Sequence, residues 1–215
     1  MGTTKRRLAL LAAASIALSA AACHGPRDPM ARGAARYSQC LPCHGGAGEG
    51  KPEIGAPPIA GLPEWYLAAQ LDKFRIGARG AHVDDAAGMR MRTMAMTLPA
   101  AEDVTAVARY VASLPRPPRP TVSLQGADAT KGQGAFGTCV ACHGADGAGN
   151  TALSAPPIAG QADWYLQTQL ANFKRGIRGK SPHDKTGPTM QAIAAGLDDQ
   201  VIKDLAAFVA TMPPK

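Results

Sequence analysis

Aromatic residues are scarce in this sequence. Phe, Trp and Tyr make up 5% of the 215 residues, whereas glycine and proline contribute 24 and 18. A chain of this length can form one large domain or two of about 100 residues each. It has little bulky apolar material for two ordinary cores. A group that is not polypeptide, held inside each domain, would supply the missing volume.

Two other patterns are absent. No segment alternates apolar and polar residues with the period of two that a half-buried strand needs. No basic run is interleaved with aromatic residues, and this absence argues against a nucleic-acid partner. We therefore expect an all-α protein that binds no nucleic acid.

A long hydrophobic run is also missing. The apolar stretch at residues 8–22 is shorter than the roughly 20 residues of a membrane span. Because it follows Lys5, Arg6 and Arg7 and ends in small residues, it predicts a cleavable export signal over residues 1–22. Loss of that segment would lower the formal net charge from +7 to +4, with 20 basic and 16 acidic residues remaining. The predicted location is the periplasm.

The first of only five cysteines directly follows this signal. Cys23 comes after three alanines and resembles the cleavage site of a bacterial lipoprotein, although Ala20 stands where that pattern prefers Leu. The alternative is ordinary cleavage nearby, which would leave a soluble protein with an incidental thiol. An unpaired thiol is a liability in an oxidising compartment, so we favour lipidation of Cys23, with residues 23–30 as a tether to the membrane.

The chain repeats itself at an offset of 99 residues. Residues 40–98 align with residues 139–197 without a gap, after which the offset falls to 98. The matches include Cys40, Cys43 and His44 with Cys139, Cys142 and His143; residues 57–61 with 156–160; Trp65, Tyr66, Leu67, Gln70 and Leu71 with Trp164, Tyr165, Leu166, Gln169 and Leu170; and Phe74, Gly77, Arg79, Gly80, Gly88, Met91 and Leu98 with Phe173, Gly176, Arg178, Gly179, Gly187, Met190 and Leu197.

The repeat predicts two domains. Proline and arginine alternate at residues 115–120, a composition that favours a stiff, extended connector. We assign residues 31–114 to the first domain, 115–125 to the linker and 126–215 to the second domain.

Apolar residues recur at helical spacing in both copies, which predicts all-α domains of a few short helices around a central object. The stripes are Leu67, Leu71 and Phe74; Leu166, Leu170 and Phe173; Val104, Val107, Val111 and Leu114; and Val201, Leu205, Phe208 and Met212. Asp103 and Asp199 fall near the starts of the last helices, where the helix dipole favours an anion.

The two Cys-x-x-Cys-His sequences match the attachment site of haem c. Two thiols separated by two residues can bond to the two vinyl groups of one haem, and the adjacent histidine then reaches the iron. Cys40, Cys43, Cys139 and Cys142 are thus expected to hold two covalent haem c groups, with His44 and His143 as iron ligands.

Other uses of this motif are less favoured. A thioredoxin-like dithiol belongs to a βαβ unit, of which the sequence shows no sign. A zinc site takes four ligands, so one zinc would leave two of the six Cys and His side chains unused.

Electron carriers commonly hold haem iron between histidine and methionine. In the second copy Met190 is the one methionine between the haem motif and the last helix. In the first copy the repeat selects Met91, with Met94 as the next candidate. A bis-histidine alternative would use His82 and His183, which do not align with each other.

Taken together, these motifs resemble the dihaem cytochrome c4 family, and the resemblance covers nearly the whole chain after the signal. The block "PPIAG…WYLxxQLxxF…RG" between haem motif and methionine carries it. The family implies two tandem class I cytochrome c domains about a pseudo-twofold axis, with neighbouring haem edges.

The resemblance also implies roles for further residues. His44 and His143 would be proximal ligands, and Met91 and Met190 distal ones. The remaining implied contacts are the Pro57 and Pro156 carbonyls to the proximal histidines, and Arg79, Arg178, Tyr66 and Tyr165 to the haem propionates. Ordinary core packing and surface charge are the alternative for these last four.

We therefore expect an electron carrier rather than an enzyme, passing single electrons from a quinol-oxidising complex or a dehydrogenase to a terminal haem–copper oxidase. One alternative is the electron-accepting subunit of a dehydrogenase complex, such as a sulfide-oxidising flavocytochrome. A dihaem peroxidase would need an open iron site, against which the matched methionines argue.

Overall fold

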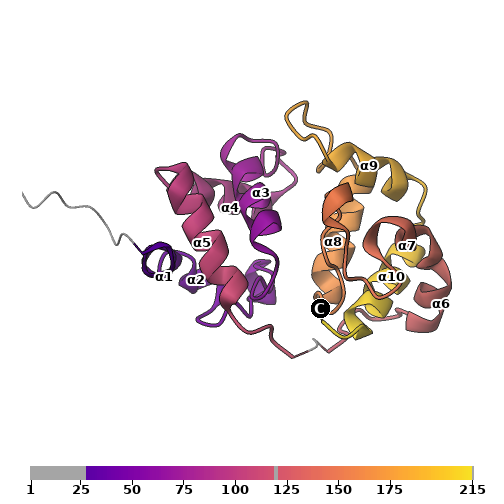
Figure 1. The fold of residues 1–215 in the computed structure, drawn as a ribbon. Coiled ribbons are helices and arrows are strands. Elements are labelled where there is room, and N and C mark those ends of the chain that lie inside the picture. The colour runs from indigo at the N-terminus through magenta and orange to yellow at the C-terminus, as the bar shows by residue number, and fades with distance from the viewer. Residues whose placement is uncertain (1–27, 119–120, 215) are drawn as a thin grey trace, which may run out of the picture.

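The computed structural model describes residues 28–118 and 121–214, and the chain forms two halves of similar construction (Figure 1). The first half contains α1 (Pro29–Tyr37), α2 (Leu41–His44), the 3₁₀-helix η1 (Pro52–Ile54), α3 (Glu64–Arg75), α4 (Ala86–Met96) and α5 (Ala101–Ser113). The second contains α6 (Ala129–Ala135), α7 (Gly137–His143), η2 (Thr151–Leu153), α8 (Asp163–Lys174), α9 (Gly187–Ala195) and α10 (Asp199–Thr211). The predicted export signal and Cys23 lie outside the described residues.

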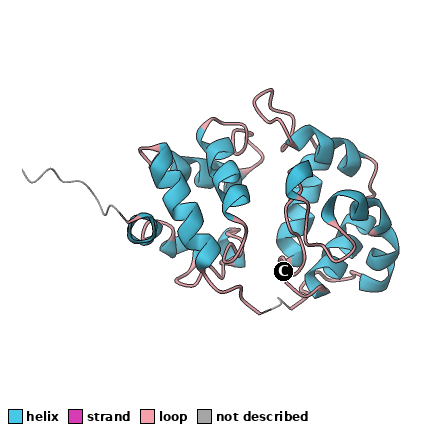
Figure 2. Ribbon diagram, viewed as in Figure 1, coloured by secondary structure: helices cyan, strands magenta, loops and turns pink. Residues whose placement is uncertain are grey.

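The all-α prediction is confirmed (Figure 2). Over the two described stretches, β pairing is limited to isolated bridges between Lys51 and Ala56 and between Asn150 and Ala155, which are themselves 99 residues apart. No helix among the described residues is both long and apolar enough to cross a bilayer.

The apolar stripes predicted from the sequence form α3, α5, α8 and α10. Their inward faces build one core in each half. The buried residues of the first are Tyr37, Leu62, Leu67, Leu98, Val104, Val107, Ala108 and Val111. Those of the second are Phe136, Ala159, Leu205, Val209 and Met212.

Helix α4, which carries the methionine-rich segment, was not predicted from the sequence. Its apolar residues show no clear stripe, and its start is fixed by an aspartate instead. Asp85 Oδ1 accepts a hydrogen bond of 2.8 Å from the Gly88 amide, and Asp184 does the same for Gly187 at the start of α9. Side-chain caps of this kind satisfy amides that the first helical turn leaves free.

Close crossings of α1 with α5 and of α6 with α10 depend on glycine. A Cβ atom at Gly33 would clash with the backbone oxygen of Ala106, and one at Gly132 would clash with that of Asp204. Aromatic pairs lie beside these crossings, with ring centroids 5.4 Å apart for Tyr37–Tyr110 and for Phe136–Phe208. Only a residue without a side chain lets these backbones approach so closely.

Replacing Gly132 by alanine is therefore expected to destabilise the second half by at least about 1–3 kcal/mol, the usual cost of overpacking a core. Denaturant unfolding of the purified protein measures it. Gly134 is the matched control, because it lies in the same helix and a Cβ added there would have no other group within 4 Å. Gly134→Ala should be neutral or stabilising by up to about 1 kcal/mol. Equal effects at both positions would contradict the close crossing.

Asp103 lies in the first turn of α5, as expected, but its carboxylate is fully buried and paired. Its Oδ1 accepts hydrogen bonds from Arg32 Nε at 2.7 Å and Arg36 Nε at 2.8 Å. The hydrogen bond from Arg32, together with that from Arg36 and both charges, lowers the pKa of Asp103 to about 2. The two ion pairs of Asp103, with Arg32 and Arg36, tie α1 to α5.

The lowered pKa of Asp103 predicts a pH dependence of folding. Between the ordinary value of 3.8 and about 2, the unfolded chain binds a proton at this position that the folded chain does not. Stability from this carboxylate is thus present above pH 3.8 and is lost as the pH falls through about 2. Asp103→Asn should flatten the dependence of the unfolding free energy on pH in that window. Urea titrations at a series of pH values measure this free energy. If it falls with pH as steeply in Asp103→Asn as in the parent protein, the assignment is contradicted.

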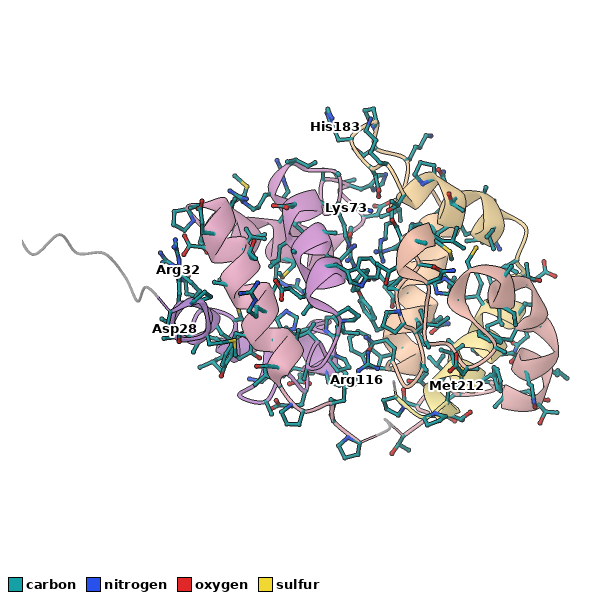
Figure 3. The ribbon with its side chains drawn as sticks, in the orientation of Figure 1. Asp28, Arg32, Lys73, Arg116, His183 and Met212 are labelled. Atoms are coloured by element: carbon teal, nitrogen blue, oxygen red, sulfur yellow. The ribbon has the colours of Figure 1, made fainter. Side chains whose placement is uncertain are left out.

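The two halves meet through α3 and α8, which face each other across the middle of the molecule (Figure 1). Lys73 of α3 reaches into the second half (Figure 3), where its ammonium lies 2.6 Å from Asp184 Oδ1. At the linker side, Arg116 donates to the carbonyl oxygens of Gly61 at 3.2 Å and Ala159 at 3.3 Å. Polar contacts therefore join the halves at both places.

Candidate haem-binding sites

Each half buries one histidine at the end of its Cys-x-x-Cys-His segment. His44 Nδ1 lies 2.9 Å from the carbonyl oxygen of Pro57, and His143 Nδ1 lies 2.9 Å from that of Pro156. A carbonyl can only accept, so each Nδ1 carries the proton and each Nε2 keeps its lone pair for a metal. Burial lowers the pKa of both histidines and keeps the rings neutral.

The cysteines of each segment are half-buried and form no disulfide. Burial, with a smaller contribution from Cys43, raises the pKa of Cys40 to about 11, and burial likewise raises the pKa of Cys139. A catalytic dithiol needs a cysteine with a lowered pKa. The environment of these thiols is therefore unlike that of a redox-active disulfide site.

A cavity of about 410 Å³ opens beside His44 in the first half. Cys40, Cys43 and Met91 line it, and so does Leu71 of α3. Residues of α8 and the loop before it also reach the cavity from the second half, namely Gln161, Trp164, Tyr165, Thr168 and Gln169. A group bound there would have one edge at the interface between the two halves, which we call the seam.

The structure places the methionines on helices. Met91 of α4 and Met190 of α9 are half-buried at equivalent positions, and Met94 lines the same cavity as Met91. The bis-histidine alternative finds no support. His82 is exposed and does not line the cavity, and His183 is exposed on a loop that projects from the body of the molecule (Figure 3).

A cluster of polar side chains crosses the seam; we name it the arginine–glutamine cluster, and its members are Gln70, Arg79, Tyr165, Gln169 and Arg178. Arg79 donates to Gln70 Oε1 at 3.0 Å, to Gln169 Oε1 at 2.9 Å and to Tyr165 Oη at 2.8 Å. Arg178 donates to Gln169 Oε1 at 2.8 Å and Gln70 Oε1 at 3.0 Å. Each arginine thus contacts a glutamine from each half.

Both guanidinium groups are buried, at 7% and 9% exposure, and each stacks on a phenylalanine of its own half. Neither forms a salt bridge with any described residue, and the buried Nε of Arg79 has no hydrogen-bond partner there. Buried charges are normally paired. Arg79 lines the cavity with no ion-pair partner among the described residues and is therefore suited to an anionic ligand, such as a carboxylate of a haem. Arg178 is bonded to the same two glutamines.

The two halves each match a known protein family. Residues 30–115 and 129–213 match the family model for cytochrome c. The chain belongs to the cytochrome c family. Its two matched regions correspond to the two halves, and each contains one Cys-x-x-Cys-His segment.

Several known proteins are similar over most of this chain. The thiosulfate dehydrogenase electron acceptor of Stutzerimonas stutzeri (strain A1501) is 32% identical over 220 residues, covering 97% of this chain and 95% of that protein. Reduced cytochrome c4 from Pseudomonas stutzeri has a TM-score of 0.68 at 27% identity, over 86% of this chain and 98% of that one. A thiosulfate dehydrogenase structure from Marichromatium purpuratum has a TM-score of 0.71 at 32% identity, covering 86% of this chain but 40% of that chain.

These likenesses confirm the cytochrome c4 resemblance and the dihaem prediction. The protein carries two covalent haem c groups and is an electron-transfer protein, not an enzyme. Each haem supplies a centre that gains or loses one electron. The buried histidines, the cavity and the unpaired arginines are consistent with such a group.

Sequence reasoning missed several residues at these sites. Gln70 and Gln169 belong to the repeat, yet the repeat alone assigned them no role. Their recurrence as polar residues within otherwise apolar helical faces was the available signal. Tyr37, which donates from its hydroxyl to the Gly45 carbonyl oxygen at 2.7 Å and so fixes the loop after His44, was also missed.

Proposed function

We propose that this cytochrome accepts electrons from a dehydrogenase outside the cytoplasm, with thiosulfate as that enzyme's substrate, and passes them to a terminal oxidase. The relative from S. stutzeri that matches nearly end to end is named for accepting electrons from thiosulfate dehydrogenase. Redox protein partners are common to these relatives. This choice joins the two roles expected from the sequence, since the dehydrogenase is the donor and the oxidase the acceptor.

The proposed iron ligands are His44 with Met91 in the first half and His143 with Met190 in the second. The supporting observation is the pair of hydrogen bonds from the histidine Nδ1 atoms to Pro57 and Pro156, which fix the rings with Nε2 free. The cysteines Cys40, Cys43, Cys139 and Cys142 would form the thioether bonds. A carbonyl bonded to the ring nitrogen orients such a ligand and tunes the metal.

The arginine–glutamine cluster is proposed to bind the propionates. Tyr66 lines the cavity beside Arg79, and Tyr165 already bonds to it across the seam. The propionates of both haems would then meet at the same polar cluster. Neighbouring haem edges would allow an electron that enters one half to leave through the other.

We also propose a periplasmic location, as for cytochrome c4 relatives, and a lipid on Cys23. A lipidated chain would keep the carrier near membrane-bound partners. Mass spectrometry of the N-terminal peptide tests this, because ordinary cleavage would leave an unmodified thiol or remove Cys23.

The test of the donor is direct. Oxidised cytochrome should be reduced within seconds when thiosulfate dehydrogenase and thiosulfate are both added, as followed by the α-band of the reduced haems. Thiosulfate without the enzyme is the control and should leave the protein oxidised. If ascorbate reduces the protein but the enzyme with thiosulfate does not, the proposed donor is wrong while the carrier role stands.

A further inference from the structure

The repeat is broken at the methionines. Helix α4 carries Met89, Met91, Met94 and Met96, whereas the aligned positions 188, 190, 193 and 195 of the second half are Pro, Met, Ile and Ala. Met89, Met94 and Met96 therefore have no methionine at the aligned position of the second half. The four methionines divide into two pairs by their place on the helix.

An α-helix turns by about 100° per residue. Met91 and Met94, three residues apart, lie about 60° apart around the axis, and both line the cavity beside His44. Met89 and Met96, seven apart, share a different face and are 40% and 59% exposed. Two sulfur atoms are thus presented to the space that the first haem is proposed to occupy, and two are not.

The two cavity methionines differ in depth. Met91 is half-buried, whereas Met94 is 38% exposed, although both line the cavity. Thr97 Oγ1, at the end of α4, donates to the Met94 carbonyl oxygen at 2.7 Å and lies 2.9 Å from Gln39 Oε1. These bonds fix the backbone at the end of α4 and leave the Met94 side chain, which lines the cavity, free of them.

Exchange between these two side chains needs a small movement. Successive residues rise about 1.5 Å along a helix, so the two Cα atoms are separated by about 4.5 Å along the axis. Methionine has three rotatable side-chain bonds and fills irregular space readily. Helix α4 also packs mainly against one other helix, α3. Side-chain torsions and a slight shift of α4 can cover this distance.

We propose that Met94 is a reserve iron ligand for the first haem, which takes the axial position when the thioether of Met91 is removed or displaced. The exchange breaks one sulfur–iron bond and forms another, and it moves no proton and no electron. The second half lacks this reserve, because Ile193 occupies the equivalent position. This inference rests on the proposed His44/Met91 ligation.

The experiment compares four haem-loaded variants by the near-infrared absorption band of methionine bound to ferric haem. The single variant Met91→Ala is expected to keep the band of both haems. The double variant Met91→Ala with Met94→Ala is expected to lose half of the band. The single variant Met190→Ala should lose half of the band without a second substitution. Adding Ile193→Met to Met190→Ala should restore that half, because it gives the second half the reserve of the first.

A Met91→Leu variant repeats the first comparison with side-chain volume preserved, in case alanine disturbs the fold. Loss of half the band in both Met91→Ala and Met91→Leu overturns the proposal, as does retention of the full band in the double variant of α4. Failure of Ile193→Met to restore any band overturns it as well. An unchanged band in Met190→Ala is a different result, since it contradicts the proposed ligands themselves.

Discussion

Replacing both Cys139 and Cys142 by serine is expected to halve the haem content of the protein, from two groups per chain to one. Without thiols the second half cannot form thioether bonds to a haem. Haem absorbance per chain after denaturation, with mass spectrometry of the haem peptides, measures the change. The remaining haem should map to the peptide containing Cys40.

The duplicated chain supplies its own control for this experiment. Replacing Cys40 and Cys43 by serine should give the complementary product, with the one haem on the peptide containing Cys142. Two haems per chain in either double variant would refute thioether attachment at the replaced pair. Loss of both haems from one double variant would show that the halves do not mature independently.

Removing the sulfur of Met190 is expected to lower one of the two reduction potentials by roughly 0.1–0.3 V, a modest part of the ~0.8 V range that axial ligands span. A thioether stabilises the reduced iron, so its loss favours the oxidised state. Redox titration of Met190→Ala, followed at the α-band, should show one wave displaced and the other nearly unchanged.

Met96→Ala is the matched control for this titration, because Met96 is 59% exposed on a face of α4 away from the cavity. Both of its waves should coincide with those of the parent protein. Two unshifted waves in Met190→Ala would mean that another side chain binds the second iron.

Much of this molecule could be predicted from its sequence, because duplication doubles every signal. The stripes through Leu67 and Val104 recur one repeat later, and they correctly predicted α3, α5, α8 and α10. The Cys-x-x-Cys-His spacing implied two haems for a chemical reason, since two thiols must reach two vinyl groups. The domain boundaries and the individual ligand roles stay predictions.

What the sequence could not supply depends on contacts between distant segments. The position of Gly132 in the sequence does not predict that α10 packs against it. The need for glycine arises only where the two helices cross. Likewise, Lys73 aligns with Asn172, so its salt bridge with Asp184 breaks the repeat symmetry and could not be deduced from the repeat. Helix α4 was missed because Asp85 caps it and no apolar stripe marks it.

The facing guanidinium groups of Arg79 and Arg178 bear on the order in which this protein is assembled. Two buried like charges oppose closure of the halves unless anions lie close to them. If the propionates supply those anions, a newly made chain gains little by closing before each half has received its haem. Haem attachment would then come first and the joining of the halves last. A chain that lacks one haem would stay open at the seam and would pass electrons poorly from one half to the other.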